Sequence, residues 1–277
     1  MGNITWNFEG KVVVITGSAT GIGRGTALEF AKAGANVMLF DFNYDEVCKT
    51  AEKCRAVAKG GKINAYKVDV TNVEQIRAAR DAVLEEFGRV DILFSNAGLG
   101  GKNMGPPLEK VPYEDWELDF SVNTLGMVKV CTEFAQIFRN QNAGKVVLTS
   151  SVAAYTLSTR TTPYTASKIA CVAFGKTYAI EMGEFNTNVN ILMPGFVYTN
   201  IYSDGTGMRY REAIGGGLLQ FDNDEDVMNA MARSGSSMQR AQTVEDMAYM
   251  VMFLCSDEAK EITGQAIAVD SGYLKRV

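Results

Sequence analysis

Histidine is missing from all 277 residues of this chain. Its absence excludes a Ser-His-Asp triad, a Cys-His dyad and an HExxH zinc site, because each of them needs an imidazole. Any proton transfer must therefore rely on tyrosine, lysine, aspartate, glutamate, cysteine or serine.

Cysteine is scarce and unpaired in the sequence. The five cysteines are odd in number, and no two of them form a CxxC pair. This pattern argues against a disulfide framework and against a cysteine-only zinc site. We therefore expect no metal centre, and a reducing cytoplasmic location.

Long apolar runs and basic clusters are missing as well. The longest apolar run, Met247–Cys255, has nine residues, whereas a membrane span needs about twenty. Residues 1–10 lack the apolar core of a signal peptide. The net charge is −5 and the basic residues are scattered, so we expect neither a membrane nor a nucleic acid as a partner.

Short apolar segments rich in β-branched residues alternate with segments of helical periodicity along the chain. The seven expected strands are Val12–Thr16, Val37–Phe40, Ile63–Val68, Asp91–Phe94, Lys145–Thr149, Val189–Met193 and Ala266–Val269. The six expected helices are Ile22–Ala33, Tyr44–Lys59, Val73–Phe87, Tyr113–Phe138, Tyr164–Gly183 and Val244–Cys255. This alternation predicts an α/β fold: a Rossmann-like, doubly wound, seven-stranded parallel sheet with helices on both faces, forming a single domain over residues 1–277.

A glycine-rich loop follows the first expected strand and opens the first expected helix. It runs from Thr16 to Gly23 with the sequence TGSATGIG. Glycines allow the tight turn and the close approach of backbone to a pyrophosphate, and the helix N-terminus supplies free N–H groups. The loop therefore indicates a dinucleotide site that includes Gly17, Thr20, Gly21, Ile22 and Gly23.

Asp41 ends the second expected strand, 24 residues beyond Gly17. At about this offset an acidic side chain binds the adenosine ribose hydroxyls and repels a 2′-phosphate. No cation stands near it in the sequence, so the pattern favours NAD over NADP. The alternative is a carboxylate that only caps the strand end or the next helix.

Tyr164 and Lys168 lie four residues apart just after Pro163, which marks a helix start. Their side chains then project from one face of the helix. Free tyrosine is a poor base at neutral pH, but a nearby cation favours the phenolate. The alternative is an ordinary exposed i, i+4 pair.

Together, these features resemble the short-chain dehydrogenase/reductase family, in its branch of about 250 residues with a TGxxxGxG loop, over essentially the whole chain. The matching motifs appear in order as Thr16–Gly23, Asp69-Val70, Ser95-Asn96-Ala97-Gly98, Asn123, Ser151, Tyr164-x-x-x-Lys168, Pro194-Gly195 with Thr199, and Thr263-Gly264. Two minor departures are Ser95, where the family often has asparagine, and Ser271, where it usually has glycine.

The resemblance implies a catalytic role for four residues. Tyr164 would be the general acid/base, and Lys168 would bind the nicotinamide ribose and favour the phenolate. Ser151, rather than its neighbour Ser150, would orient the substrate oxygen, and Asn123 would hold a water in the proton path. For the cofactor, the resemblance adds Asp69, Val70, Asn96, Ala97, Gly98, Pro194, Val197 and Thr199.

The expected activity is NAD-dependent hydride transfer between a secondary alcohol and a ketone, in a homodimer or homotetramer. A lobe of about residues 200–243 breaks the alternation and is rich in glycine, as lids often are. We expect it to be mobile and partly helical. Its apolar residues favour a hydrophobic cyclic alcohol over a sugar, unless they pack onto the core; they are Tyr198, Ile201, Tyr202, Met208, Leu218, Leu219 and Phe221.

Several rivals remain at this point. A polyol or hydroxyacyl dehydrogenase of the same family would carry the same motifs. A nucleotide-sugar epimerase resembles a different branch, and an enoyl reductase of the superfamily has a longer Tyr-to-Lys gap. A catalytically silent NAD-binding scaffold predicts a damaged tetrad, whereas all four residues are present here.

Overall fold

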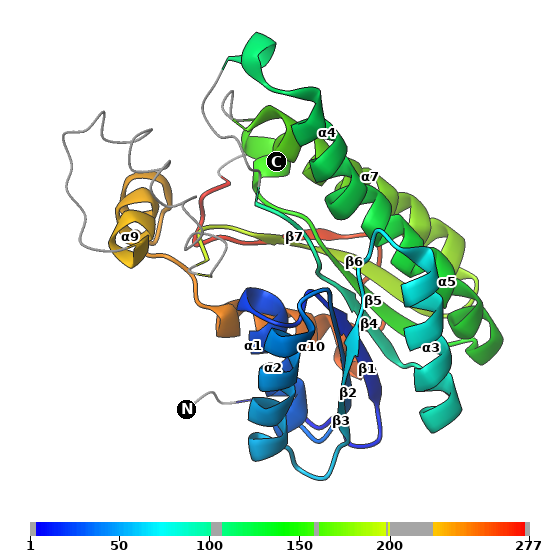
Figure 1. Ribbon diagram of the computed structural model, residues 1–277. Coiled ribbons are helices and arrows are strands. Elements are labelled where there is room, and N and C mark those ends of the chain that lie inside the picture. Colours follow the sequence, from blue (N-terminus) through cyan, green and yellow to red (C-terminus); the bar gives the residue numbers. More distant parts are fainter. Residues whose placement is uncertain (1–3, 101–106, 158–160, 198, 200–223, 275–277) are drawn as a thin grey trace.

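The computed structural model describes residues 4–100, 107–157, 161–197, 199 and 224–274. Seven strands form one parallel sheet in the order β3-β2-β1-β4-β5-β6-β7 (Figure 1). Their bounds are β1 (Val12–Thr16), β2 (Asn36–Asp41), β3 (Ile63–Lys67), β4 (Ile92–Ser95), β5 (Gly144–Thr149), β6 (Thr187–Pro194) and β7 (Ala266–Val269). The predicted doubly wound sheet is confirmed: β1 and β7 have the predicted bounds, and the bounds of the other strands differ by at most two residues.

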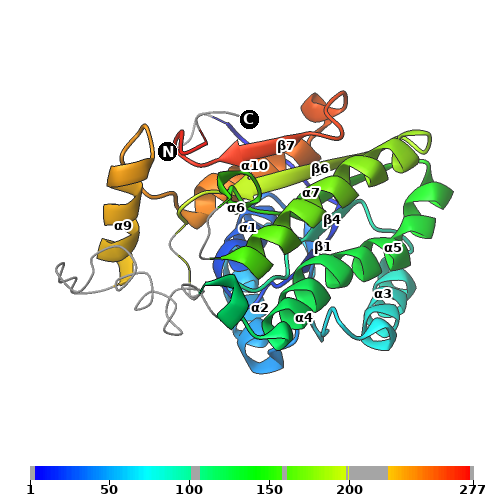
Figure 2. The ribbon, with the colours of Figure 1, turned by 90° about the horizontal axis from the view of Figure 1, so that it is seen from above.

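Helices cover both faces of the sheet (Figures 1 and 2). One face carries α1 (Gly21–Lys32), α2 (Tyr44–Val57) and α10 (Val244–Cys255), and the other carries α3 (Val73–Phe87), α5 (Met127–Gln141) and α7 (Thr162–Gly183). Each layer has its own buried cluster: Phe30 of α1 and Met247 of α10 belong to one, and Phe134 of α5 and Cys171 of α7 to the other. The strands are therefore apolar on both sides, as a doubly covered parallel sheet requires.

The helix expected over Tyr113–Phe138 is interrupted in the structure. It consists of α4 (Tyr113–Asp119), a π-helical stretch over Phe120–Gly126, and α5. The Asn123 carbonyl within the stretch accepts a hydrogen bond from the Cys171 thiol of α7 at 3.2 Å. π-Helical turns occur frequently at functional sites, and this one carries a residue of the expected tetrad.

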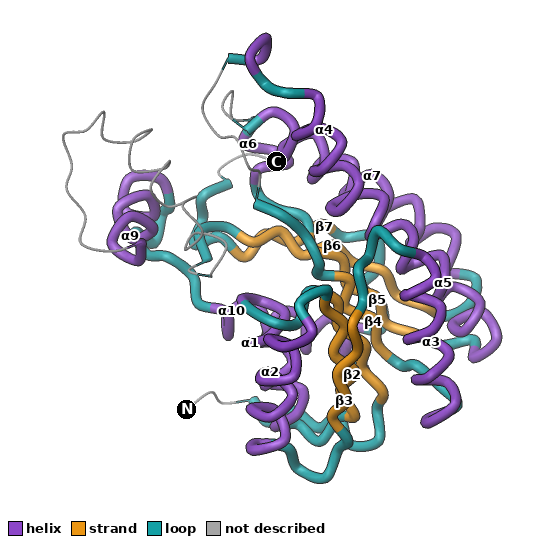
Figure 3. Tube along the Cα trace, viewed as in Figure 1, coloured by secondary structure: helices purple, strands orange, loops and turns teal. Residues whose placement is uncertain are grey.

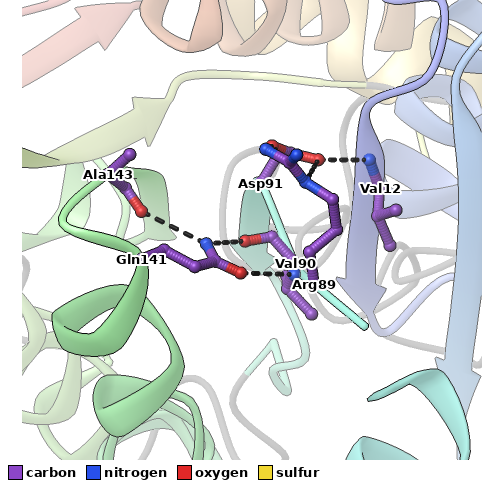
Figure 4. Close-up of polar contacts among 6 residues, drawn as sticks. All are labelled: Val12, Arg89, Val90, Asp91, Gln141 and Ala143. Atoms are coloured by element: carbon purple, nitrogen blue, oxygen red, sulfur yellow. Dashed lines mark hydrogen bonds and ion pairs between the residues drawn. The ribbon is translucent and has the colours of Figure 1, made fainter. Parts of the chain in front are cut away.

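Polar contacts fix the segment that leads into the amino end of β4 (Figure 4). The Asp91 carboxylate accepts the Val12 N–H at 2.8 Å and pairs with Arg89. The Gln141 side chain accepts the Val90 N–H at 3.1 Å and donates to the Val90 carbonyl at 2.7 Å. These bonds tie the start of β4 to β1 and to the end of α5.

The expected lobe falls partly within the described residues. The helix α9 (Asp224–Gly235) lies in it and stands away from the sheet, as the tube in Figure 3 shows. The seven apolar residues that favoured a cyclic substrate lie at positions 198 and 201–221, outside the described residues. Among the described helices, none is long and apolar enough to span a membrane.

Candidate active site

A cavity of about 940 Å³ lies along the carboxyl ends of the strands, where the strand order reverses between β1 and β4. In doubly wound sheets ligands bind at this switch point. Asp41 and Val70 line one part of the cavity, and Ser151, Tyr164 and Lys168 line another. The structure therefore brings three of the four expected catalytic residues to one site, together with all expected cofactor residues except Gly23, which does not line the cavity.

The glycine loop of the cavity has no room for side chains at its key positions. Gly17 has a φ of +63°, and a Cβ there would lie 2.7 Å from the Cα of Ala97. A Cβ at Gly23 would lie 2.1 Å from the Gly17 carbonyl oxygen. Thr20, Gly21 and Ile22 line the cavity where α1 begins. This close-packed turn at a helix N-terminus suits a dinucleotide pyrophosphate.

Asp41 is buried at the end of β2 and lines the cavity. Its Oδ2 accepts the Ala19 N–H at 2.9 Å, and its Oδ1 accepts the Asn43 N–H at 2.9 Å. Burial raises the pKa of Asp41 above its ordinary value, although these backbone hydrogen bonds offset part of the rise. The side chain braces the glycine loop and also lines the cavity; its bond to a ribose stays a prediction.

Cations are scarce around the cavity. Among the described residues that line it, Lys168 is the only lysine or arginine. Phe42 and Asn43 follow Asp41 in the lining, and Ser18 is fully buried with its hydroxyl donated to the Phe40 carbonyl. The described walls next to Asp41 therefore offer no charge that would bind a 2′-phosphate.

Asn96 links the ends of three strands beneath the cavity. Its Nδ2 donates to the carbonyls of Thr16 and Gly17, at 3.2 Å and 3.1 Å. Its Oδ1 accepts from the Thr149 hydroxyl at 3.2 Å. These bonds show that Asn96 steadies β1, β4 and β5. Other expected cofactor residues also line the cavity, namely Asp69, Val70, Ala97, Gly98, Pro194, Val197 and Thr199.

Tyr164 and Lys168 lie on α7 and face the cavity together. The Lys168 side chain is buried, and its Nζ donates to the Thr149 carbonyl at 3.3 Å. The same Nζ lies 5.7 Å from the centroid of the Tyr164 ring. The helix thus brings the Lys168 ammonium and the Tyr164 ring to the same wall of the cavity.

The two neighbouring serines differ in how their hydroxyls are used. The Ser150 Oγ donates to the Lys168 carbonyl at 2.7 Å and is buried. The Ser151 Oγ accepts the Ala153 N–H at 3.1 Å, so its own proton remains available to a ligand. Both residues line the cavity, but the free hydroxyl proton favours Ser151 as the residue that orients the substrate.

Asn123 is fully buried behind the cavity wall and is not among the residues that line it. Its Oδ1 accepts the Leu99 N–H at 2.7 Å, and its Nδ2 donates to the Ser167 hydroxyl at 3.1 Å. The side chain thus holds the loop after β4 against α7. Its water-holding role stays a prediction.

Several residues of this region were not identified from the sequence. Among them, Phe196 and Tyr273 line the cavity. Asp119 is buried on α4 near Lys168, and burial raises its pKa to about 6. The helix α4 carries four acidic residues within seven positions, so its sequence does not single out Asp119 as a buried one. Within the described residues, no cluster of three potential ligands could hold a metal ion.

Comparisons with known proteins agree with this geometry. A family model described as enoyl-(acyl carrier protein) reductase matches residues 17–274. A 3-oxoacyl-[acyl-carrier-protein] reductase of Thermotoga maritima is 33% identical, and the match covers 95% of this chain and 98% of that protein. Carveol dehydrogenase from Mycobacterium avium, solved in complex with NAD, is 26% identical with a TM-score of 0.88, covering 98% of this chain and all of that one. NAD⁺-bound xylitol dehydrogenase is 27% identical with a TM-score of 0.86, covering 96% and 99%.

Proposed function

The chain belongs to the short-chain dehydrogenase/reductase family of oxidoreductases, and on that premise we propose that it is an NAD-dependent dehydrogenase of a secondary alcohol or the corresponding ketone. One observation carries the proposal: Tyr164, Lys168 and Ser151 line the same cavity as the glycine loop and Asp41. A silent scaffold would not need this arrangement. Formation of NADH from NAD and a secondary alcohol, followed at 340 nm, tests it.

In alcohol oxidation, Ser151, Tyr164 and Lys168 each have a separate role. The Ser151 hydroxyl donates a hydrogen bond to the substrate oxygen and orients it. Tyr164, as the phenolate, accepts the hydroxyl proton, and the buried Lys168 stabilises that phenolate. NAD, when bound, accepts the hydride. In ketone reduction, Tyr164 returns the proton to the carbonyl oxygen.

The expected preference for NAD rests on Asp41. In Asp41→Ala combined with Phe42→Arg, the repelling carboxylate is replaced by a cation, and the N–H groups of Ala19 and Asn43 become free to bind a phosphate. We expect the ratio of kcat/KM values to shift toward NADP by at least about tenfold, or about 1.4 kcal/mol. Asp45→Ala, which removes an exposed carboxylate from α2, should leave the ratio unchanged. A wild-type protein that prefers NADP would contradict the assignment.

The two serines give a second test. Ser151→Ala removes the free hydroxyl, so we expect kcat/KM to fall by about tenfold to a hundredfold, as when one hydrogen bond to the reacting oxygen is lost. Ser150→Ala removes only a bond to the Lys168 carbonyl; it should lower the unfolding free energy by about 1 kcal/mol and change turnover by less than about threefold. The reverse ranking in steady-state kinetics would assign the role to Ser150.

For the substrate we propose a hydrophobic cyclic alcohol. The described lining includes several apolar side chains: Leu99, Leu118, Val122, Val152, Phe196 and Tyr273. A polyol would need more fixed hydrogen-bonding partners than this wall offers. A polyol is the second candidate because xylitol dehydrogenase shares the fold. A panel of alicyclic, polyol, 3-hydroxyacyl and enoyl thioester substrates separates the classes.

The helices α4 and α7, and the π-helical stretch that follows α4, present apolar side chains to solvent. Tyr113 and Ile180 are each 83% exposed, and Leu125 and Ile169 are also exposed. We propose that these helices pair across two-fold axes in a homodimer or homotetramer, which would bury the exposed residues. Light scattering at micromolar concentration should give at least twice the 30.1 kDa chain mass, and Ile180→Glu should weaken the assembly. A wild-type monomer would contradict the proposal.

A further inference from the structure

Phe196 and Tyr273 form an aromatic pair in the cavity wall, although they are far apart in the sequence. Their ring centroids are 4.7 Å apart and the ring planes meet at 72°, which is the favoured edge-to-face arrangement. The pair forms because β6 and β7 are parallel neighbours, so their carboxyl ends deliver both residues to the same edge of the sheet.

Phe196 also lies beside the last residue of α9, because a Cβ at Gly235 would lie 3.8 Å from the Phe196 ring. Val197, the next residue, forms a bridge with Gln242. Thr199, two residues further on, packs near Gly21, where a Cβ would lie 3.3 Å from the Thr199 Cβ. Thr199 therefore borders the glycine loop, whereas Phe196 packs against Tyr273 and α9 in the cavity wall.

The turn that carries Tyr273 is held by its own polar groups. The Asp270 carboxylate is buried and accepts the N–H groups of Gly272 at 2.9 Å and Leu274 at 2.7 Å. The Asp270 carbonyl accepts the Tyr273 N–H at 3.2 Å. The orientation of the Tyr273 ring is thus set by a closed turn.

Residues after α9 join this turn to the Phe196 segment. The Gln242 side chain donates to the Ser271 hydroxyl at 2.7 Å, and its N–H donates to the Phe196 carbonyl at 2.8 Å. Ser271 has a φ of +55°, a strained conformation for a residue other than glycine. At Gly235, the last residue of α9, a Cβ would lie 2.6 Å from the Tyr273 ring. Contacts from three segments of the chain therefore hold the aromatic pair in place, and this pair is called the aromatic wall below.

We propose that Phe196 and Tyr273 are specificity-determining residues that select a ring-bearing alcohol or ketone by packing against the ring of the substrate. The inference rests on the proposed function and identifies the side chains that determine which substrates the dehydrogenase binds. Two rigid aromatic side chains offer a large apolar contact at low entropic cost. A small acyclic alcohol reaches Tyr164 without filling this space, so it gains little from the aromatic wall.

Binding of cyclohexanone and 2-butanone to the NADH-loaded protein, followed by NADH fluorescence, tests the aromatic wall without requiring turnover. We expect the wild type to bind cyclohexanone at least about tenfold more tightly, or about 1.4 kcal/mol. Tyr273→Ala should reduce this ratio to less than about threefold, whereas Tyr273→Phe should restore it. Tyr249→Ala, which removes an exposed tyrosine of α10, is the matched control and should leave both affinities unchanged.

Phe196→Leu keeps the test decisive if Tyr273→Ala does not fold, and it should also reduce the ratio. The inference would be overturned if the variants weaken the binding of both ketones equally, or if the wild type binds the two ketones with the same affinity. Oxidation of 2-butanol with NAD tests the proposed function separately. If binding is selective for the ring and depends on Tyr273, but 2-butanol is not oxidised, the role of the aromatic pair is supported and the proposed dehydrogenase function is contradicted.

Discussion

Replacement of Tyr164 by phenylalanine should lower kcat by about 10²–10⁴-fold, the usual contribution of general acid/base catalysis. The substitution keeps the ring in the cavity wall and removes only the hydroxyl that exchanges the substrate proton. Lys168 keeps its bond to the Thr149 carbonyl, so the cofactor part of the cavity should keep its shape. We therefore expect NAD affinity to change by less than about threefold.

The control is Tyr178→Phe on the same helix. Tyr178 is buried, and its hydroxyl donates to the Cys131 carbonyl at 3.3 Å. Loss of this bond should lower the unfolding free energy by about 1 kcal/mol and leave turnover intact. Steady-state kinetics at 340 nm and NAD titration give both readouts. If Tyr164→Phe retains more than about a tenth of wild-type activity, another group must move the proton.

Periodicity and strand alternation were enough to predict the architecture. The five inner strands of the sheet are mostly buried, and such strands appear in the sequence as short apolar runs. The helix over Tyr113–Phe138 was predicted as continuous. The π-helical stretch within it depends on contacts of Asn123 with Leu99 and with α7, and such tertiary contacts leave no local period in the sequence.

The candidate site was predictable where spacing along one element fixes geometry. The four-residue spacing of Tyr164 and Lys168 places both on one face of α7, and the glycine loop must precede α1. Phe196 and Tyr273 meet only because β6 and β7 are adjacent, and the sequence of a single segment does not determine which strands are adjacent. Packing likewise places Asp119 in the interior, whereas Glu117, two residues earlier, is exposed.

Asp119 should destabilise the folded protein above about pH 6. Burial raises the pKa of its carboxyl from 3.8 to about 6; Lys168 lowers it and Asp115 raises it. Because the folded pKa exceeds the unfolded one, the folded state binds the proton more tightly, and stability falls as the pH rises from about 4 to about 6. A shift of about two units corresponds to about 2–3 kcal/mol, fully present at pH 7–8.

Asp119→Asn removes this cost with a side chain of nearly the same shape. We expect its unfolding free energy, measured by urea denaturation from pH 4.5 to 8, to exceed the wild-type value increasingly with pH and to level off above about pH 7 at about 2 kcal/mol. Glu117→Gln removes the same charge from the exposed side of α4 and should change stability by less than about 0.5 kcal/mol at every pH. If Asp119→Asn is instead less stable than the wild type at pH 8, the attraction between Asp119 and Lys168 outweighs the cost of burial, and the two groups form a stabilising ion pair beside Tyr164.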